Sequence, residues 1–199
     1  MDKTRPFGKG RRRRPLLIVF TMALAIASVG TTAYTFALFT DVAASGANDF
    51  TTATIDIALS PASAVLTASA MMPGDTTNGT LTVQNNGTGT LRYAMTTAAT
   101  NADTKGLRDQ LTLVVKTKDT DTAGCANFNG TQLSTGALSG ALFGDVTAGG
   151  QAGDRTLAGA ASEILCFRAT LPSGTGNGFQ GAATTATFTF SAEQTANNP

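Results

Sequence analysis

The sequence predicts an all-β protein, a jelly-roll-like antiparallel β-sandwich preceded by an amino-terminal hydrophobic signal helix. Three observations indicate this class. Short runs of alternating apolar and polar residues recur along the chain, and glycine, asparagine and proline residues separate them. Charged residues make up only 14% of the 199 residues, and neither heptads nor an alternation of strands with helices is present. Many short strands joined by glycine-rich turns are typical of a sandwich or a jelly roll.

The amino-terminal part has the pattern of a secretory signal. Residues 1–14 contain seven basic residues and one acid, and the apolar stretch "PLLIVFTMALAIAS" begins at Pro15. A basic region, an apolar core (15–29) and then small residues predict a signal peptide over residues 1–37. A permanent anchor is an alternative, because no charge interrupts residues 15–40 and such a length can span a bilayer.

Residues 38–49 are predicted to be the amino-terminal segment of the mature protein, and residues 50–199 its β-sandwich domain. From Leu38 onward the chain has seven basic and twelve acidic residues, so this part is acidic. No basic stripe with interleaved aromatic residues is present, which makes nucleic acid an unsuitable partner. A membrane contact is expected only through an uncleaved signal.

Six alternating runs predict strands, and a weaker seventh covers residues 64–70. The six are 54–60, 79–85, 91–95, 111–117, 163–171 and 185–193. The "NNGTG" turn, Asn85 to Gly89, is predicted to join the second and third of them as a hairpin. A helical turn is expected only within residues 101–110. Residues 119–161 are predicted to be a long irregular loop.

The two cysteines, Cys125 and Cys166, are expected to form a disulfide if the protein is exported. The bond would close a loop of 41 positions, which is worth about 4 kcal/mol on a chain-entropy model. Two buried free thiols are the alternative.

The sequence lacks the usual equipment of an enzyme. It has no histidine, which excludes Ser-His-Asp and Cys-His catalysis and the HExxH zinc helix. We therefore expect no catalytic residue, no metal site and no cofactor. "DTDTAG", from Asp119 to Gly124, begins like a calcium loop but lacks its later ligands. Three Asn-Gly-Thr sequons are interpreted first as turns (Asn78, Asn86 and Asn129).

Three stretches resemble the TasA and camelysin family of secreted bacterial proteins. "GTTAYTFALFTDVAASGANDFTTATIDIALS" is similar to the family's signal end and first strand, and "MMPGDTTNGTLTVQNNGTGTLRYAM" to its Pro-Gly-Asp turn and following strands. "TFTFSAEQTANNP" is similar to the closing strand and tail. The resemblance covers both ends of the body well and residues 98–162 hardly at all.

The resemblance implies a jelly-roll fold, export, and cleavage between Ala37 and Leu38 by a signal peptidase of the SipW type. It also implies a location at the surface or in the extracellular biofilm matrix of a bacterium, in fibres. Camelysins are described as metalloproteases, but this sequence has no histidine to carry such an activity over.

Cleavage after Ala37 would release a strand-like segment, and this suggests how fibres form. We expect the segment to add to a sheet edge of the next subunit, a head-to-tail contact that propagates a homopolymer. The residues expected to take part are Leu38, Phe39, Asp41, Val42 and Phe50. Other matrix or cell-wall components are possible further partners. One alternative is that residues 38–49 are merely a flexible terminus of the mature protein. For the function, the alternatives are a monomeric surface module on an uncleaved anchor, with the loop 119–161 as its contact surface, and a secreted metalloprotease.

Overall fold

The computed structural model of the protein describes residues 51–198, which belong to a unit with its own core. Among these residues lie nine strands, one helix and one 3-10 turn. The elements are β1 (Ile57–Ser60), β2 (Thr76–Asn85), β3 (Leu91–Ala99), α2 (Leu107–Gln110), β4 (Thr112–Thr117), β5 (Gln132–Ala137), β6 (Leu142–Phe143), β7 (Arg155–Leu157), β8 (Ser162–Thr170), η1 (Asn177–Phe179) and β9 (Ala186–Gln194). The fold is thus the all-β sandwich that the sequence predicts.

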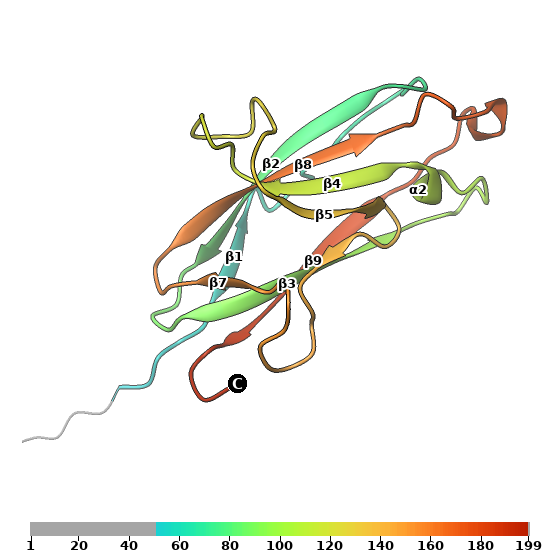
Figure 1. Ribbon diagram of the computed structural model, residues 1–199. Helices are drawn as coiled ribbons and strands as arrows, with labels where there is room; N and C mark the ends of the chain where they lie inside the picture. The colour runs from blue at the N-terminus through green and yellow to red at the C-terminus, as the bar shows by residue number, and fades with distance from the viewer. Residues whose placement is uncertain (1–50, 199) are drawn as a thin grey trace, which may run out of the picture. The chain divides into compact units, whose positions relative to one another are not determined.

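The strands form two antiparallel sheets (Figure 1). The first has the order β1-β2-β8-β4-β5. In the second, β3 pairs with β9 along its whole length and, on its other side, with β6 and β7. No two strands paired in the described part are parallel, so consecutive strands need no helical crossover.

Alternation along each strand places the core between the two sheets. Leu81 and Val83 of β2, Leu113 and Val115 of β4, and Leu165 and Phe167 of β8 are all at most 1% exposed. Leu91, Tyr93 and Met95 of β3 face them from the second sheet. Each of the six alternating runs in the sequence overlaps one of these strands or β1 or β9, as predicted. The helical turn is confirmed as α2, shorter than the stretch that predicted it.

The predicted hairpin at Asn85 to Gly89 is wrong. β2 and β3 belong to different sheets, so this turn crosses from one layer to the other. The buried side chain of Asn85 organises the crossing. Its Oδ1 accepts a hydrogen bond from the Gly87 amide at 3.0 Å, and its Nδ2 donates to the carbonyl oxygens of Gly89 and Leu157. An asparagine-glycine turn has similar residues whether it forms a hairpin within one sheet or crosses between two sheets. Only the strands that pair with its flanks distinguish the two cases.

The prediction of a long irregular loop at 119–161 also needs correction. β5, β6 and β7 lie within it and extend both sheets. They are six, two and three residues long, so their alternation is too brief to read from sequence. Conversely, residues 64–70 form no strand, although Val65 and Leu66 pack partly against the core.

The signal peptide of residues 1–37 and the segment 38–49 lie outside the described residues. Within residues 51–198, no helix has the length and hydrophobicity needed to cross a membrane.

Candidate assembly interface

The edge of β9 is the longest open strand edge in the described part of the chain. All nine residues of β9 pair with β3, from Ala186 opposite Ala99 to Gln194 opposite Leu91. Among residues 51–198 no strand pairs with the other side of β9. Apart from the Asn198 side chain, which donates to the Gln194 carbonyl at 3.3 Å, no loop of this part is hydrogen-bonded to the β9 backbone. A strand edge of this kind presents unpaired N–H and C=O groups that can bind another strand.

The edges of the first sheet are shorter or covered. β1 has four residues and ends at the Ser60–Pro61 bond, and beyond it the 61–70 segment lies against β2. The hydroxyl of Thr77 donates to the Thr67 carbonyl at 3.1 Å, and a Cβ on Gly79 would lie 2.1 Å from the Val65 carbonyl oxygen. β5 has six residues, and its pairing with β4 is broken by a register shift after Val115.

The inward side of β9 is firmly held in the core. Phe188 lies with its ring centroid 5.1 Å from that of Phe167 in the opposite sheet. Phe190 packs against Tyr93 and Phe143, at 6.0 and 6.4 Å. Because these rings fix β9, its open edge is a rigid surface, which lowers the entropy lost when a strand binds there.

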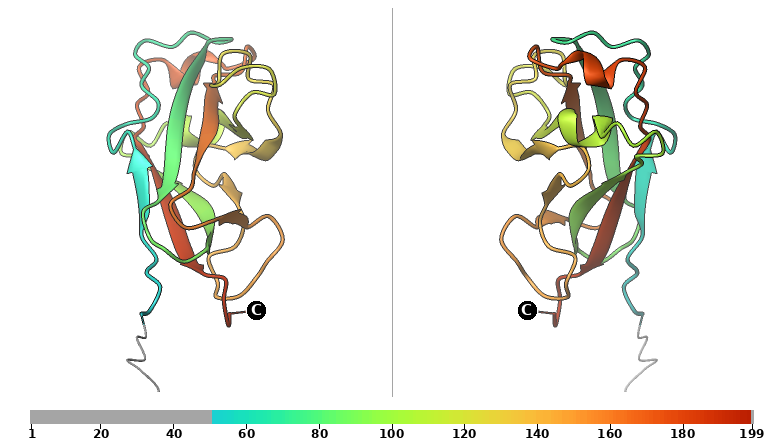
Figure 2. Two further views of the ribbon diagram at one scale, coloured as in Figure 1. Left: turned by 90° about the vertical axis from the view of Figure 1, so that its left-hand side faces the viewer. Right: turned by 90° about the vertical axis from the view of Figure 1, so that its right-hand side faces the viewer.

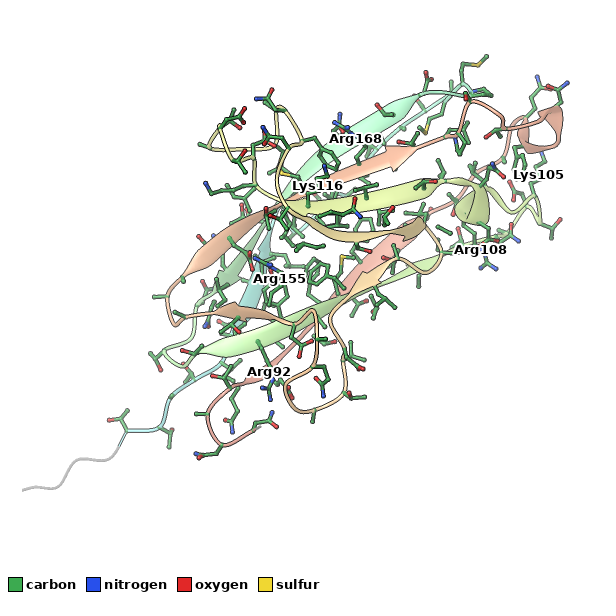
Figure 3. The ribbon with its side chains drawn as sticks, in the orientation of Figure 1. Arg92, Lys105, Arg108, Lys116, Arg155 and Arg168 are labelled. Atoms are coloured by element: carbon green, nitrogen blue, oxygen red, sulfur yellow. A yellow bond between two sulfur atoms is a disulfide. The ribbon has the colours of Figure 1, made fainter. Side chains whose placement is uncertain are left out.

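Few of the devices that normally protect an edge are present on β9. The strand contains no lysine and no proline. Its single charge, Glu193, is paired with Arg92 of β3 across 2.6 Å and also accepts a hydrogen bond from the Gly149 amide (Figure 3). These hydrogen bonds, those from Arg92 foremost, lower the pKa of Glu193. The carboxylate thus has its partners within the subunit and does not guard the edge.

The described chain begins beside the carboxyl end of β9. The Gly89 amide donates to the Thr54 carbonyl at 3.0 Å, and the next residue, Thr90, accepts a hydrogen bond from the Thr195 amide. In Figure 2 the blue start of the described chain and the red end of β9 leave the sandwich at the same end. The described chain therefore begins at the end of the domain where β9 finishes.

A second group of interest is an ionic cluster between the sheets. Glu163 of β8 pairs with Arg155 of β7 through two guanidinium nitrogens, with a shortest distance of 2.5 Å. The Tyr93 hydroxyl donates to the same carboxylate at 2.5 Å. Burial and this hydrogen bond raise the pKa of Tyr93 well above its usual value. Both glutamates of the chain are thus bound by arginines, and neither is free to act as a nucleophile or a base.

The third group is the loop 119–130, which covers the outer face of the first sheet (Figure 3). Cys125 is disulfide-bonded to Cys166 of β8, with 5.4 Å between their Cα atoms. Phe128, 5% exposed, lies beneath the guanidinium of Arg168 at 3.9 Å and the ammonium of Lys116 at 4.9 Å. This explains why Cys166 is buried although it points away from the main core.

The carboxylate of Asp119 organises this loop and is not arranged as a calcium ligand. It is 1% exposed and accepts hydrogen bonds from the amides of Asn127 and Asn129 and from the Thr122 hydroxyl, at 2.7–3.0 Å. Its oxygen atoms are therefore occupied by donors of the protein.

The sequons occupy different surroundings. Asn78 lies within β2 and binds Arg168 at 2.7 Å, and Asn129 accepts a hydrogen bond from the Thr120 amide. Asn86 lies in the crossing turn and is exposed.

The cleavage and polymerisation residues predicted from sequence (Ala37, Leu38, Phe39, Asp41, Val42 and Phe50) lie outside the described residues. The sequence analysis missed their candidate acceptor. It identified β9 as a strand, but an edge is a property of topology, and no pattern within β9 reveals that one side lacks a partner.

The described residues do not fit a catalytic metal. Between Thr51 and Asn198 no three side chains of the histidine, cysteine, aspartate and glutamate types gather as ligands, and both cysteines are oxidised. The carboxylates of Glu163, Glu193 and Asp119 are each engaged with donors of the protein.

These features define a two-sheet antiparallel protein with a bound loop on one face and one long open edge. The family model described as camelysin metallo-endopeptidase matches residues 15–115, more than half of the chain. The chain belongs to this family, in agreement with the resemblance drawn from sequence motifs. No curated protein matches the chain.

Proposed function

We propose that the protein is an exported structural subunit of cell-surface or biofilm-matrix fibres, and not a protease. In this proposal a signal peptidase of the SipW type cleaves between Ala37 and Leu38. The released segment 38–49 then adds as a strand to the next subunit. The main partner is a further copy of the same chain, in a bacterial extracellular location.

The observation that carries the proposal is the nine-residue open edge of β9 in a domain whose other strand edges are shorter or covered. An added strand gains backbone hydrogen bonds worth about 1 kcal/mol each and the burial of its inward side chains. The domain supplies the edge, and the segment ahead of residue 50 supplies a proline-free sequence with apolar residues at Leu38, Phe39 and Val42.

A second copy is the natural source of such a strand. Each chain carries one segment and one long open edge, so donor and acceptor occur in equal numbers. A contact between two different surfaces of identical subunits forms a ring if the rotation between subunits closes. If the rotation does not close, the contact repeats and builds a filament.

The alternative of a metallo-endopeptidase has the family description in its favour but no chemical support from the residues. The chain has no histidine, and its two glutamates are held by Arg92 and Arg155. Zinc peptidases normally bind their metal through histidines and leave a carboxylate free as base.

The proposal is tested with protein that begins at Leu38. We expect filaments by electron microscopy. The matched control replaces residues 38–49 with a glycine-serine linker of the same length, and we expect a folded monomer. Filaments that persist in the control would contradict strand addition. Cleavage of casein by the pure chain, inhibited by chelators, would favour the protease instead.

A further inference from the structure

We propose that the outer face of the first sheet binds an anionic polysaccharide through Arg168 of β8, Lys116 of β4 and Lys118. This inference goes beyond the fibre function and does not depend on strand addition. Within residues 51–198, three arginines form ion pairs with carboxylates, namely Arg92, Arg108 and Arg155. The three cations of the proposed site form none there, and they share one face of the domain.

The register of the strands brings Arg168 and Lys116 together. Residues directly opposite each other in an antiparallel pair have their side chains on the same face of the sheet. Arg168 is opposite Val114 of β4. Lys116 is opposite Cys166, which precedes Arg168 by two residues on β8 and so lies on the same face. The two cations are therefore diagonal neighbours on adjacent strands, on the face that points away from the core.

The Phe128 ring holds both charges in place. Its centroid lies 3.9 Å from the Arg168 guanidinium and 4.9 Å from the Lys116 ammonium. The Lys116 ammonium also donates to the Phe128 carbonyl at 2.9 Å, and Arg168 Nε donates to Asn78 Oδ1 at 2.7 Å. The Nη groups of Arg168 have no hydrogen-bond acceptor in the part of the chain that the structure describes.

These two fixed charges repel each other. Because both lie close to one ring, their separation is below the Debye length of about 10 Å at 0.1 M salt. An oxyanion bound between them removes the repulsion and accepts the unused N–H groups of Arg168. A guanidinium with free Nη groups matches the two oxygens of a carboxylate or of a phosphate group.

Lys118 extends the patch along the sheet. Its amide donates to the Ile164 carbonyl at 3.0 Å, so the chain stays beside β8 after β4 has ended. Lys118 is exposed and follows Lys116 by two residues. In an extended chain this spacing corresponds to roughly 6.6–6.8 Å. A polymer with negative groups at a similar interval can therefore contact both lysines.

The acids of the loop 119–130 do not neutralise the patch. Asp119 is 1% exposed, and its carboxylate accepts hydrogen bonds from the loop itself. Asp121 is exposed and accepts a hydrogen bond from Asn127 Nδ2 at 3.0 Å. Neither aspartate pairs with a cation among residues 51–198. The patch thus stays positive on a body that is acidic as a whole.

The surroundings of the patch favour a polysaccharide over a nucleic acid. Phe128, the ring that touches the cations, is only 5% exposed and offers no surface on which a base could stack. Amide and hydroxyl side chains, which can hydrogen-bond to sugar hydroxyl groups, are exposed on the same face. They are Asn78, Thr80, Gln132 and Thr135. The sugar polymer can carry its negative charge as carboxylate or as phosphate.

Binding to immobilised polymers tests the ligand class. Protein that begins at Leu38 is applied to polygalacturonate, which carries carboxylates, and to phosphomannan, which carries phosphates, with uncharged dextran as the control. We expect binding to at least one of the two anionic polymers, weakened by salt, and none to dextran. The better of the two identifies the anion. Binding to neither, or tighter binding to double-stranded DNA than to both, would overturn the proposal.

Substitutions test the site. Arg168→Gln and Lys116→Gln should each weaken binding about fivefold, the upper range for one exposed ion pair. Lys105→Gln is the matched control, because it removes the same charge from an exposed lysine far from the patch (Figure 3). We expect it to change the affinity less than twofold. Equal losses from Lys105→Gln and Arg168→Gln would show that only the net charge matters and would overturn the site.

Two further variants separate binding from folding, because Arg168→Gln also removes a contact with Phe128. The side chain of Lys118 makes no hydrogen bond or ion pair within residues 51–198, so Lys118→Gln should keep the unfolding midpoint. It should still weaken binding about threefold. Arg168→Lys keeps the charge and should bind more tightly than Arg168→Gln. Unchanged binding by Lys118→Gln, or equal binding by the two Arg168 variants, would contradict the proposed contacts.

Discussion

The hydroxyl of Tyr93 donates a 2.5 Å hydrogen bond to the carboxylate of Glu163, and this contact joins the two sheets of the sandwich. Arg155 of β7 binds the same carboxylate, so one acidic group of the first sheet ties together two strands of the second. The side chains of Arg155 and Glu163 are 27% and 17% exposed, which leaves the ion pair partly screened by water. The tie holds β3, the neighbour of β9, in a fixed position.

Replacement of Tyr93 by phenylalanine should weaken this connection without leaving Glu163 unpaired. We expect the free energy of unfolding to fall by about 1.5–3 kcal/mol, the range for a hydrogen bond to a charged group. Urea unfolding of the two proteins measures the difference. A loss below about 0.5 kcal/mol would show that water replaces the hydroxyl at no cost.

Removal of the disulfide should destabilise the protein and release the loop 119–130. For the 41-residue separation of Cys125 and Cys166, the chain-entropy model gives about 4 kcal/mol. We therefore expect a corresponding loss in the double variant Cys125→Ala, Cys166→Ala. Limited proteolysis should cut first within residues 119–130. Cleavage elsewhere, with this loop intact, would contradict the covering role of the bond.

Asp119 should contribute to the dependence of stability on acidity. Burial raises the pKa of its carboxyl group. The hydrogen bonds from the amides of Asn127 and Asn129 and from the Thr122 hydroxyl together lower this pKa by a larger amount, so the net shift is downward. The charged form is therefore favoured in the folded state. Its contribution is complete above the unfolded pKa of about 3.9 and is lost as the pH falls through the folded pKa.

The test compares the wild type with Asp119→Asn between about pH 2 and pH 5. We expect the free energy of unfolding of the wild type to fall more steeply toward acid. Equal slopes for the two proteins would mean that other carboxylates carry the acid sensitivity.

Gly79 should not tolerate a side chain. A Cβ at this position would lie 2.1 Å from the backbone oxygen of Val65, so Gly79→Ala must displace the 61–70 segment from β2. We expect a loss of about 1–3 kcal/mol, as for other overpacked sites. Gly140→Ala is the matched control, because no atom lies within 4 Å of its Cβ position. A similar loss in both variants would show that the close approach to Val65 is not its cause.

The sequence predicts the strands well because their alternation is a local property. Phe188 and Phe190 reveal the inward face of β9, and Leu113 and Val115 that of β4, with no knowledge of their neighbours. The disulfide partners also follow from composition, since only two cysteines are present.

Pairing between strands is not local, and there the sequence is insufficient. The residues around Asn85 have the pattern of a hairpin turn, yet the turn crosses between layers. This is because β2 pairs with β1 and with β8, which lies far along the chain, and not with β3. The short strands β6 and β7 are defined by their contacts with β3 and have almost no pattern of their own. The open edge of β9 is likewise visible only in the assembled topology.

The most direct test of the account is amide hydrogen exchange along β9, measured residue by residue in protein that begins at Leu38. The assembled form is compared with the monomer that has the linker in place of residues 38–49. We predict that the β9 amides facing away from β3 are slowed at least tenfold upon assembly, while exchange on β5 is unchanged. Filaments in which the β9 amides exchange as fast as in the monomer would contradict the account.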